Sequence, residues 1–107
     1  MPRQKVKTAP DADVLALLEI LESYKEAHPR AEVAAYRQNS ACIRIRIIDP
    51  AFKKWDRADR HDRIWELFDG LPDDIVSQIT ILLLLTPDET KTSIANMDFE
   101  NPIPSRL

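Results

Sequence analysis

Apolar residues near the start of the chain recur at the spacing of a helix. They lie three and four residues apart, which places them on one helical face: Val14, Leu17, Leu18 and Leu21. Pro10 precedes Asp11 and Asp13, either of which can cap a helix, and Pro29 stops the pattern near His28. The pattern predicts one amphipathic helix whose apolar face packs against the core.

The next segment alternates with a period of two, which is typical of a strand. Residues 42 to 48 place isoleucines on one face and mostly arginines on the other: Ile43, Ile45 and Ile47 against Cys42, Arg44 and Arg46. Residues 31 to 37 precede this strand across the turn residues Gln38, Asn39 and Ser40. We predict a hairpin with one core face and one face that meets water or a ligand.

A connector and two helices are expected after the hairpin. Phe52 is the lone aromatic anchor of the connector, and Asp56 is the expected N-cap of a helix that runs to about Gly70. Pro72 stands at a first helical position before two acidic residues, so a second, short helix is expected over 72–77.

Residues 79 to 85 predict a third strand that is apolar on both faces. Its positions alternate between two sets: Ile79, Ile81, Leu83 and Leu85 against Thr80, Leu82 and Leu84. We expect Leu82 and Leu84 to need a cover. That cover is either the C-terminal tail, through Met97, Phe99 and Ile103, or a second copy of the protein in a homodimer.

Composition places these elements in one domain. The chain has 107 residues and 12.3 kDa, enough for a single core. We expect a disordered basic arm over 1–9, one domain over 10–90 and a weakly structured C-terminal extension over 91–107. The longest apolar run of the chain, 81–85, is too short to span a bilayer. We therefore expect a cytoplasmic protein that does not contact membranes.

Two residue counts exclude whole classes of site. A single glycine, Gly70, is incompatible with the Gly-rich loops that cradle nucleotide phosphates. A single cysteine, Cys42, excludes an intramolecular disulfide and a thiolate-rich metal site. No nucleophile and base stand at a spacing that specifies catalysis, so we expect no enzyme activity and no cofactor. His61 shares a helical face with apolar residues, and we interpret it as a structural histidine whose ring bonds the backbone.

The predicted order is helix, strand, strand, helix, short helix, strand. This is an α+β layout with helices packed on one face of a three-stranded mixed sheet. Within it, the segment from Ile45 to Phe52, continued to the pair Arg60–His61, resembles the motif of the BolA family. In that family a strand ends in an Asp-x-Phe turn that leads through a capped helix start to Arg-His. The run 86–89, Thr-Pro-Asp-Glu, is similar to the family's Thr-Pro-Glu ending, and the matched region covers about residues 12 to 90.

The resemblance implies a fold related to the type II KH domain, a cytoplasmic setting and no catalytic activity. It also implies two kinds of partner. Bacterial relatives are regulators that contact DNA, and many members pair with a monothiol glutaredoxin and share an iron-sulfur cluster with it.

The residues that the resemblance assigns to the cluster are absent. The family histidine at the start of the last strand corresponds to Gln78, and the loop after the first strand carries no imidazole or thiol. An amide is a poor iron ligand, so we expect no metal in the family manner. Cys42 falls inside a strand, where a thiol usually serves as a small apolar side chain.

Basic residues, by contrast, gather in the middle of the chain. Between Arg37 and Arg63 there are eight Lys/Arg and four Asp, a local balance of +4, while the formal net charge of the chain is -3. Phosphate contacts come mainly from such side chains. The candidate nucleic-acid-binding residues are Arg44, Arg46, Lys53, Lys54, Arg57 and Arg60. Trp55 could stack on a base or pack over the helix start. The simpler interpretation is a solvated helix face with internal pairs such as Asp59–Arg63.

We therefore predict a non-enzymatic, BolA-like regulatory or binding module that contacts DNA or RNA through this basic face. The alternative is a protein-interaction adaptor that pairs with a glutaredoxin-like partner, or with itself through the third strand.

Overall fold

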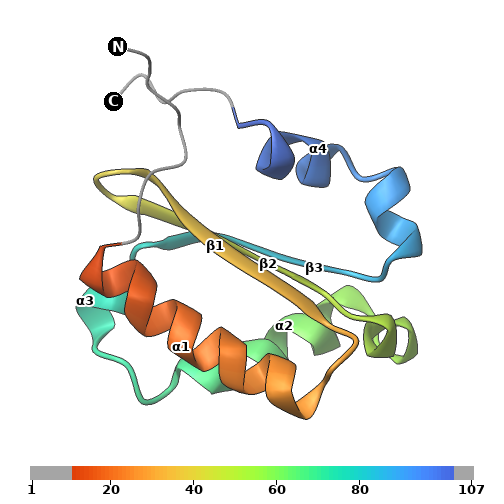
Figure 1. Ribbon diagram of the computed structural model, residues 1–107, viewed down its shortest axis with the longest axis horizontal. Helices are drawn as coiled ribbons and strands as arrows, with labels where there is room; N and C mark the ends of the chain where they lie inside the picture. The colour runs from red at the N-terminus through yellow and green to blue at the C-terminus, as the bar shows by residue number, and fades with distance from the viewer. Residues whose placement is uncertain (1–10, 103–107) are drawn as a thin grey trace.

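The computed structural model describes residues 11–102. These residues form the predicted α+β fold, in which helices pack against a three-stranded sheet (Figure 1). Three strands lie in the order β1-β2-β3, with β1 antiparallel and β3 parallel to the central β2. The elements are α1 (Ala12–Ala27), β1 (Glu32–Asn39), β2 (Cys42–Ile48), η1 (Pro50–Lys54), α2 (Arg57–Trp65), η2 (Glu66–Phe68), α3 (Asp73–Val76), β3 (Ile79–Leu85), η3 (Asp88–Lys91) and α4 (Ile94–Glu100), where η denotes a 3₁₀ helix. The predicted fold class is confirmed.

Helix boundaries follow the capping residues of the sequence. The Asp11 side chain accepts a hydrogen bond from the amide of Val14 at 3.0 Å, and α1 ends just before His28 and Pro29. Asp56 caps α2 in the same way, through the amide of Asp59 at 2.8 Å. Among residues 11–102, no helix is both long enough and apolar enough to cross a membrane.

The main core lies between the sheet and the layer formed by α1 and α2. Three isoleucines of β2 are buried there, together with residues of both helices and of η1: Ile43, Ile45, Ile47, Leu17, Leu21, Ile64 and Phe52. Phe52 is 0% exposed, which agrees with its predicted role as an anchor.

The assignment of the two faces of β3 was wrong. Leu82 and Leu84 lie in the main core, because they pair with Ile45 and Ile47 and share their face of the sheet. The pairing shifts by one residue near the start of β3, so that Ile79 and Leu82, and not Ile79 and Ile81, face the helices. Strict alternation along β3 does not allow for this shift, so it places every residue after the shift on the wrong face of the sheet.

The opposite face of the sheet is covered by α4 (Figure 1). Phe99 is only 3% exposed, and the Tyr36 hydroxyl donates to its carbonyl oxygen at 3.0 Å. The tail therefore covers the sheet through Phe99, whereas Met97 points outward at 57% exposure. A weakly structured extension was the wrong prediction for residues 94–100, where Ser93 caps a helix through the amide of Asn96. The predicted arm over 1–9 and Ile103 lie outside the described residues.

Candidate nucleic-acid interface

The six basic residues predicted to form one face are divided by the fold into three groups. Arg44 and Arg46 lie beneath α4, Arg60 is buried at the start of α2, and the others are exposed on η1 and α2. The exposed residues are Lys53, Lys54 and Arg57. A continuous basic face made of all six was therefore the wrong prediction.

Arg44 and Arg46 are bonded to the helix that covers them. Nη1 of Arg44 donates to Oδ2 of Asp98 at 2.9 Å, and Nη1 of Arg46 donates to Oδ1 of Asn96 at 2.9 Å and pairs with Glu100. The side chains of the two arginines are 15% and 12% exposed. The expectation that this face meets water or a ligand failed because a helix formed where the sequence suggested an extension.

Arg60 holds three elements together from inside the protein. It is 5% exposed, and its Nε donates to the carbonyl oxygens of Phe52 and Trp55 at 3.1 Å each. Nη1 donates to the carbonyl of Leu84 at 3.0 Å, and the guanidinium pairs with both carboxylate oxygens of Glu89, at 2.8 and 3.1 Å. Most of its N–H donors are used within the fold, so Arg60 serves as a structural residue.

The Glu89 carboxylate, which pairs with Arg60, is also held by a hydrogen bond from the backbone. Glu89 Oε1 also accepts from the amide of Thr86 at 2.9 Å, while Thr86 Oγ1 accepts from the amide of Glu89 at 3.3 Å. This reciprocal pair has the arrangement of a capping box. The hydrogen bonds from Arg60 lower the pKa of Glu89 to about 2. The two segments that carry the family resemblance, 45–61 and 86–89, are thus joined by one ion pair.

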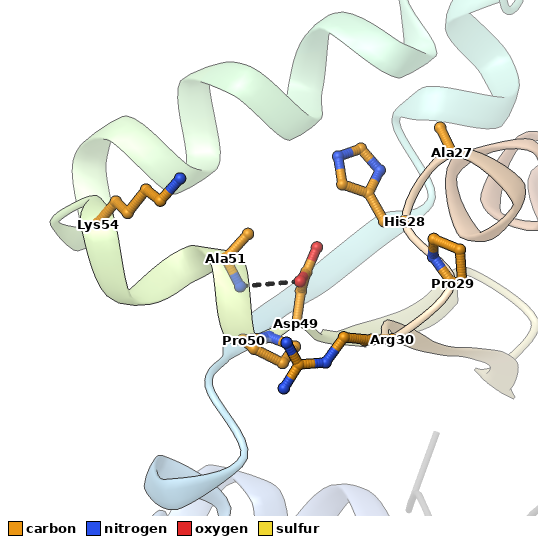
Figure 2. A pocket seen from close by; sticks show the side chains of 8 residues that line it. All are labelled: Ala27, His28, Pro29, Arg30, Asp49, Pro50, Ala51 and Lys54. Carbon is orange, nitrogen blue, oxygen red and sulfur yellow. Dashed lines mark hydrogen bonds between the residues drawn. The ribbon is translucent and has the colours of Figure 1, made fainter.

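The exposed lysines lie beside two adjoining hollows, each of about 430 Å³. The first is lined by His28, Arg30 and Lys54 together with Asp49 (Figure 2). The second is lined by Lys53, Arg60 and Glu89, together with Arg30 again. Because Arg30 and Pro50 border both, the two hollows lie next to each other, and we name them together the η1 groove.

Arg30 is a cation of this groove that the sequence reasoning missed. It is exposed in the turn after α1, before the basic segment that begins at Arg37, and no periodic pattern marks it. Within residues 11–102, the structure gives no hydrogen bond or ion pair to the side chains of Arg30, Lys53 or Lys54. Their charges are therefore available to a ligand. Arg57 is exposed but lines neither hollow.

Hydrogen bonds fix the floor of the first hollow. Asp49, which is 3% exposed, caps η1 through the amide of Ala51 at 2.9 Å and accepts from the Tyr24 hydroxyl at 2.5 Å. Burial and this carboxylate raise the pKa of Tyr24 above its ordinary value. The ring of His28 stacks on that of Tyr24 with centroids 4.1 Å apart. These contacts hold η1, and hence both lysines, against the end of α1.

Two further residues singled out in the sequence are Trp55 and His61. Trp55 carries the guanidinium of Arg63 at 4.3 Å from its ring centroid, so one of its ring faces is already covered. His61 is partly buried, and within the described part of the chain its ring makes no hydrogen bond. The backbone bond predicted for His61 is not found.

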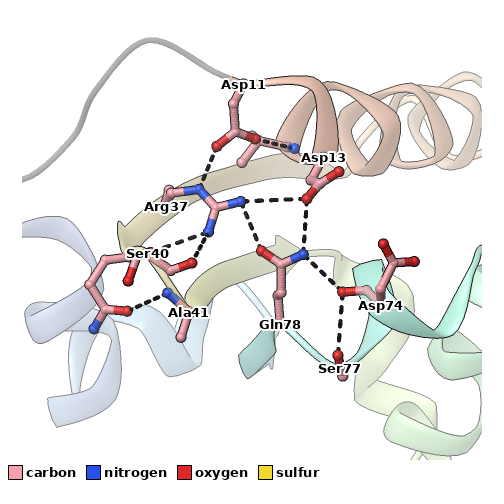
Figure 3. A network of polar contacts seen from close by, with 10 residues as sticks. Asp11, Asp13, Arg37, Ser40, Ala41, Asp74, Ser77 and Gln78 are labelled. Atoms are coloured by element: carbon pink, nitrogen blue, oxygen red, sulfur yellow. Dashed lines mark hydrogen bonds and ion pairs between the residues drawn. The ribbon is translucent and has the colours of Figure 1, made fainter.

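The position where the resemblance would place an iron ligand belongs to a polar network (Figure 3). The Gln78 amide nitrogen donates to Asp13 at 2.9 Å and to the carbonyl of Asp74 at 2.8 Å, and its oxygen accepts from Arg37 at 2.9 Å. Arg37 also pairs with Asp11, and this hydrogen bond lowers the pKa of the Asp11 carboxyl. Gln78 therefore connects α1, β1 and α3.

Comparison with known proteins identifies no relative: no family model matches the chain, and no curated protein or solved structure is significantly similar to it. The BolA resemblance accordingly stays a prediction based on the residues quoted above.

Proposed function

We propose that this chain is a non-catalytic, cytoplasmic binding module of BolA-like type that contacts DNA or RNA through the η1 groove. The observation that carries the proposal is the set of three exposed cations without an internal partner, Arg30, Lys53 and Lys54, around two adjoining hollows. Phosphate groups bind such side chains in a sequence-independent manner.

The charges around the groove support an anionic ligand. In the first hollow, Arg30 and Lys54 stand with His28 around one carboxyl, and that carboxyl already accepts two internal hydrogen bonds. In the second, the Glu89 carboxylate is neutralised by Arg60, and the exposed Asp88 is the remaining acid beside the two cations Arg30 and Lys53. The groove therefore presents cations to a ligand, although the chain as a whole carries a formal charge of -3.

The adaptor alternative receives less support from the geometry. Self-association through the third strand rested on Leu82 and Leu84, and both lie in the main core. Pairing with a monothiol glutaredoxin through a shared cluster would need ligands where Gln78 is bonded into its network. Nucleic-acid binding needs no rearrangement of this kind.

The test is a titration of labelled single-stranded and double-stranded oligonucleotides, followed by fluorescence anisotropy. We expect the double variant Lys53→Ala/Lys54→Ala to bind about tenfold more weakly than the unaltered chain, because two phosphate contacts are lost. A matched control is Arg57→Ala/Lys91→Ala, which removes the same charge from exposed residues outside both hollows. Equal affinities for the two double variants would contradict the proposal.

A further inference from the structure

The face of the sheet beneath α4 has the chemistry of a single-strand binding surface. We propose that this outer face, formed by Tyr36, Arg44 and Arg46, is a second surface for single-stranded nucleic acid, and that α4 occupies it as an internal stand-in ligand. The surface is separate from the η1 groove and does not depend on it.

The three side chains lie together on neighbouring strands. Tyr36 and Arg44 are direct partners in the pairing of β1 with β2, and Arg46 follows two residues later on the same face. Nη1 of Arg44 is 3.3 Å from the Tyr36 hydroxyl. Unpaired bases stack on aromatic rings and guanidinium planes, while arginine also binds the phosphates. A sheet face that alternates these groups can therefore take a strand along its length.

The contacts of α4 resemble those of such a ligand. The Phe99 ring lies edge-on to Tyr36, with centroids 4.8 Å apart, and the Arg46 guanidinium lies 4.7 Å from its centroid. Asp98 and Glu100, on either side of Phe99, place their carboxylates on Arg44 and Arg46. The aromatic ring thus stands where a base would stack, and the carboxylates stand where phosphates would bind.

The fit of α4 to the arginines is incomplete. The described hydrogen bonds from Arg44 and Arg46 to α4 use Nη1, and Arg46 Nε is buried without a hydrogen-bond partner. A phosphate can accept from Nε and Nη together in a bidentate arrangement. A peptide carboxylate accepts in the same way, but a nucleotide also brings a base that stacks on aromatic rings and guanidinium planes such as those of Tyr36, Arg44 and Arg46. These observations favour nucleic acid as the external ligand.

The attachment of α4 is small enough to be displaced. The helix has seven residues, of which Asn96 and Phe99 are buried, and its outward residues Ile94 and Met97 are 81% and 57% exposed. An isolated helix of this length is unstable in water, so it depends on its contacts with the sheet. A ligand that replaces those contacts can release it.

The binding test uses an oligouridine of about twelve nucleotides, the scale of a single-strand site. We expect Asp98→Ala/Glu100→Ala to bind it at least tenfold more tightly than the unaltered chain, because the covered state no longer competes. The matched control, Glu19→Ala/Glu22→Ala, removes the same charge from exposed positions of α1 on the other side of the sheet. Adding Arg44→Gln/Arg46→Gln to the first variant should abolish the gain.

Two results of this titration would overturn the proposal. One is an equal gain in the α1 control, which would assign the effect to net charge. The other is a gain that survives the arginine substitutions. Repeating the series with Lys53→Ala/Lys54→Ala in every chain separates this surface from the η1 groove, because the gain should persist even if groove binding is absent.

A second measurement needs no substitution and therefore does not depend on whether a variant folds. Saturating oligouridine should accelerate amide hydrogen exchange over residues 94–100 in the full chain, since α4 leaves the sheet. Unchanged or slower exchange there would contradict displacement. Faster exchange with an acidic peptide, but not with oligouridine, would show that the surface belongs to a protein partner and would also overturn the proposal.

Discussion

Two basic regions of this protein, the η1 groove and the outer face of the sheet, differ in how the fold uses their charges. Arg30, Lys53 and Lys54 of the groove have no bonded partner among residues 11–102, whereas Arg44 and Arg46 are paired with carboxylates of α4. Apart from Arg30, these cations come from the same stretch of sequence. The difference teaches that the availability of a charge depends on what the chain brings back over it, and not on its neighbours in the sequence.

The largest loss of stability is expected on removing Arg60, the cation with the most hydrogen bonds inside the described part of the protein. Arg60→Ala removes the donor from three carbonyl oxygens and from the Glu89 carboxylate in a buried site. We expect it to lower the free energy of unfolding by about 3–5 kcal/mol, because each buried carbonyl oxygen left without a donor costs about 1–3 kcal/mol and the partly exposed Glu89 also loses its partner. Urea denaturation measures the change. The exposed Arg57→Ala is the control, with a change within about 0.5 kcal/mol. Similar values for both would show that Arg60 is not structural.

A smaller loss is expected at the floor of the groove. Tyr24→Phe keeps the ring that stacks on His28 and removes the hydroxyl that donates to Asp49 at 2.5 Å. A buried carboxylate left with one donor fewer should lower the free energy of unfolding by about 1–3 kcal/mol. Urea denaturation is again the measurement, and an unchanged midpoint would show that this bond does not hold η1 in place.

The Arg60–Glu89 pair also predicts a dependence on pH. The pKa of Glu89 is lowered from 4.5 to about 2 in the folded protein, so the stability it contributes is present above about pH 4.5 and is lost as pH falls toward 2. Unfolding midpoints measured across this range should fall less steeply in Glu89→Gln than in the unaltered chain. Parallel pH profiles would mean that the carboxylate is not stabilised by folding.

The smallest effect on stability is expected for the exposed lysines of the η1 groove. Lys53→Ala/Lys54→Ala removes exposed charges without internal contacts, so the unfolding free energy should change by no more than about 0.5 kcal/mol. Thermal unfolding checks this directly. A marked loss would show that the lysines serve the fold, and the groove would then lose its distinction from the outer face.

The sequence predicted the elements well where local signals are strong. Alternating isoleucines and the capping aspartates Asp11 and Asp56 locate β2 and the starts of two helices. It failed where the outcome depends on contacts distant in sequence. A pairing shift early in β3 reversed its two faces, and no local pattern reports this. Arg46 and its partner Glu100 lie 54 residues apart, so their pairing depends on the fold.

The same reason limits what could be predicted of the candidate site. Lys53 and Lys54, which the sequence offered as candidate binding residues, are exposed, as is usual for lysines in a short polar connector. Arg30 joins them only because the end of α1 packs beside η1, which charge spacing along the chain does not show.

The most direct test of nucleic-acid binding through the η1 groove is the salt dependence of oligonucleotide affinity. For a single strand, the logarithm of the binding constant should fall linearly with the logarithm of salt concentration, and Lys53→Ala/Lys54→Ala should reduce the slope by about 1.4, or about 0.7 for each lost phosphate contact. A slope that is unchanged by the double substitution, or an affinity that does not respond to salt, would contradict this function.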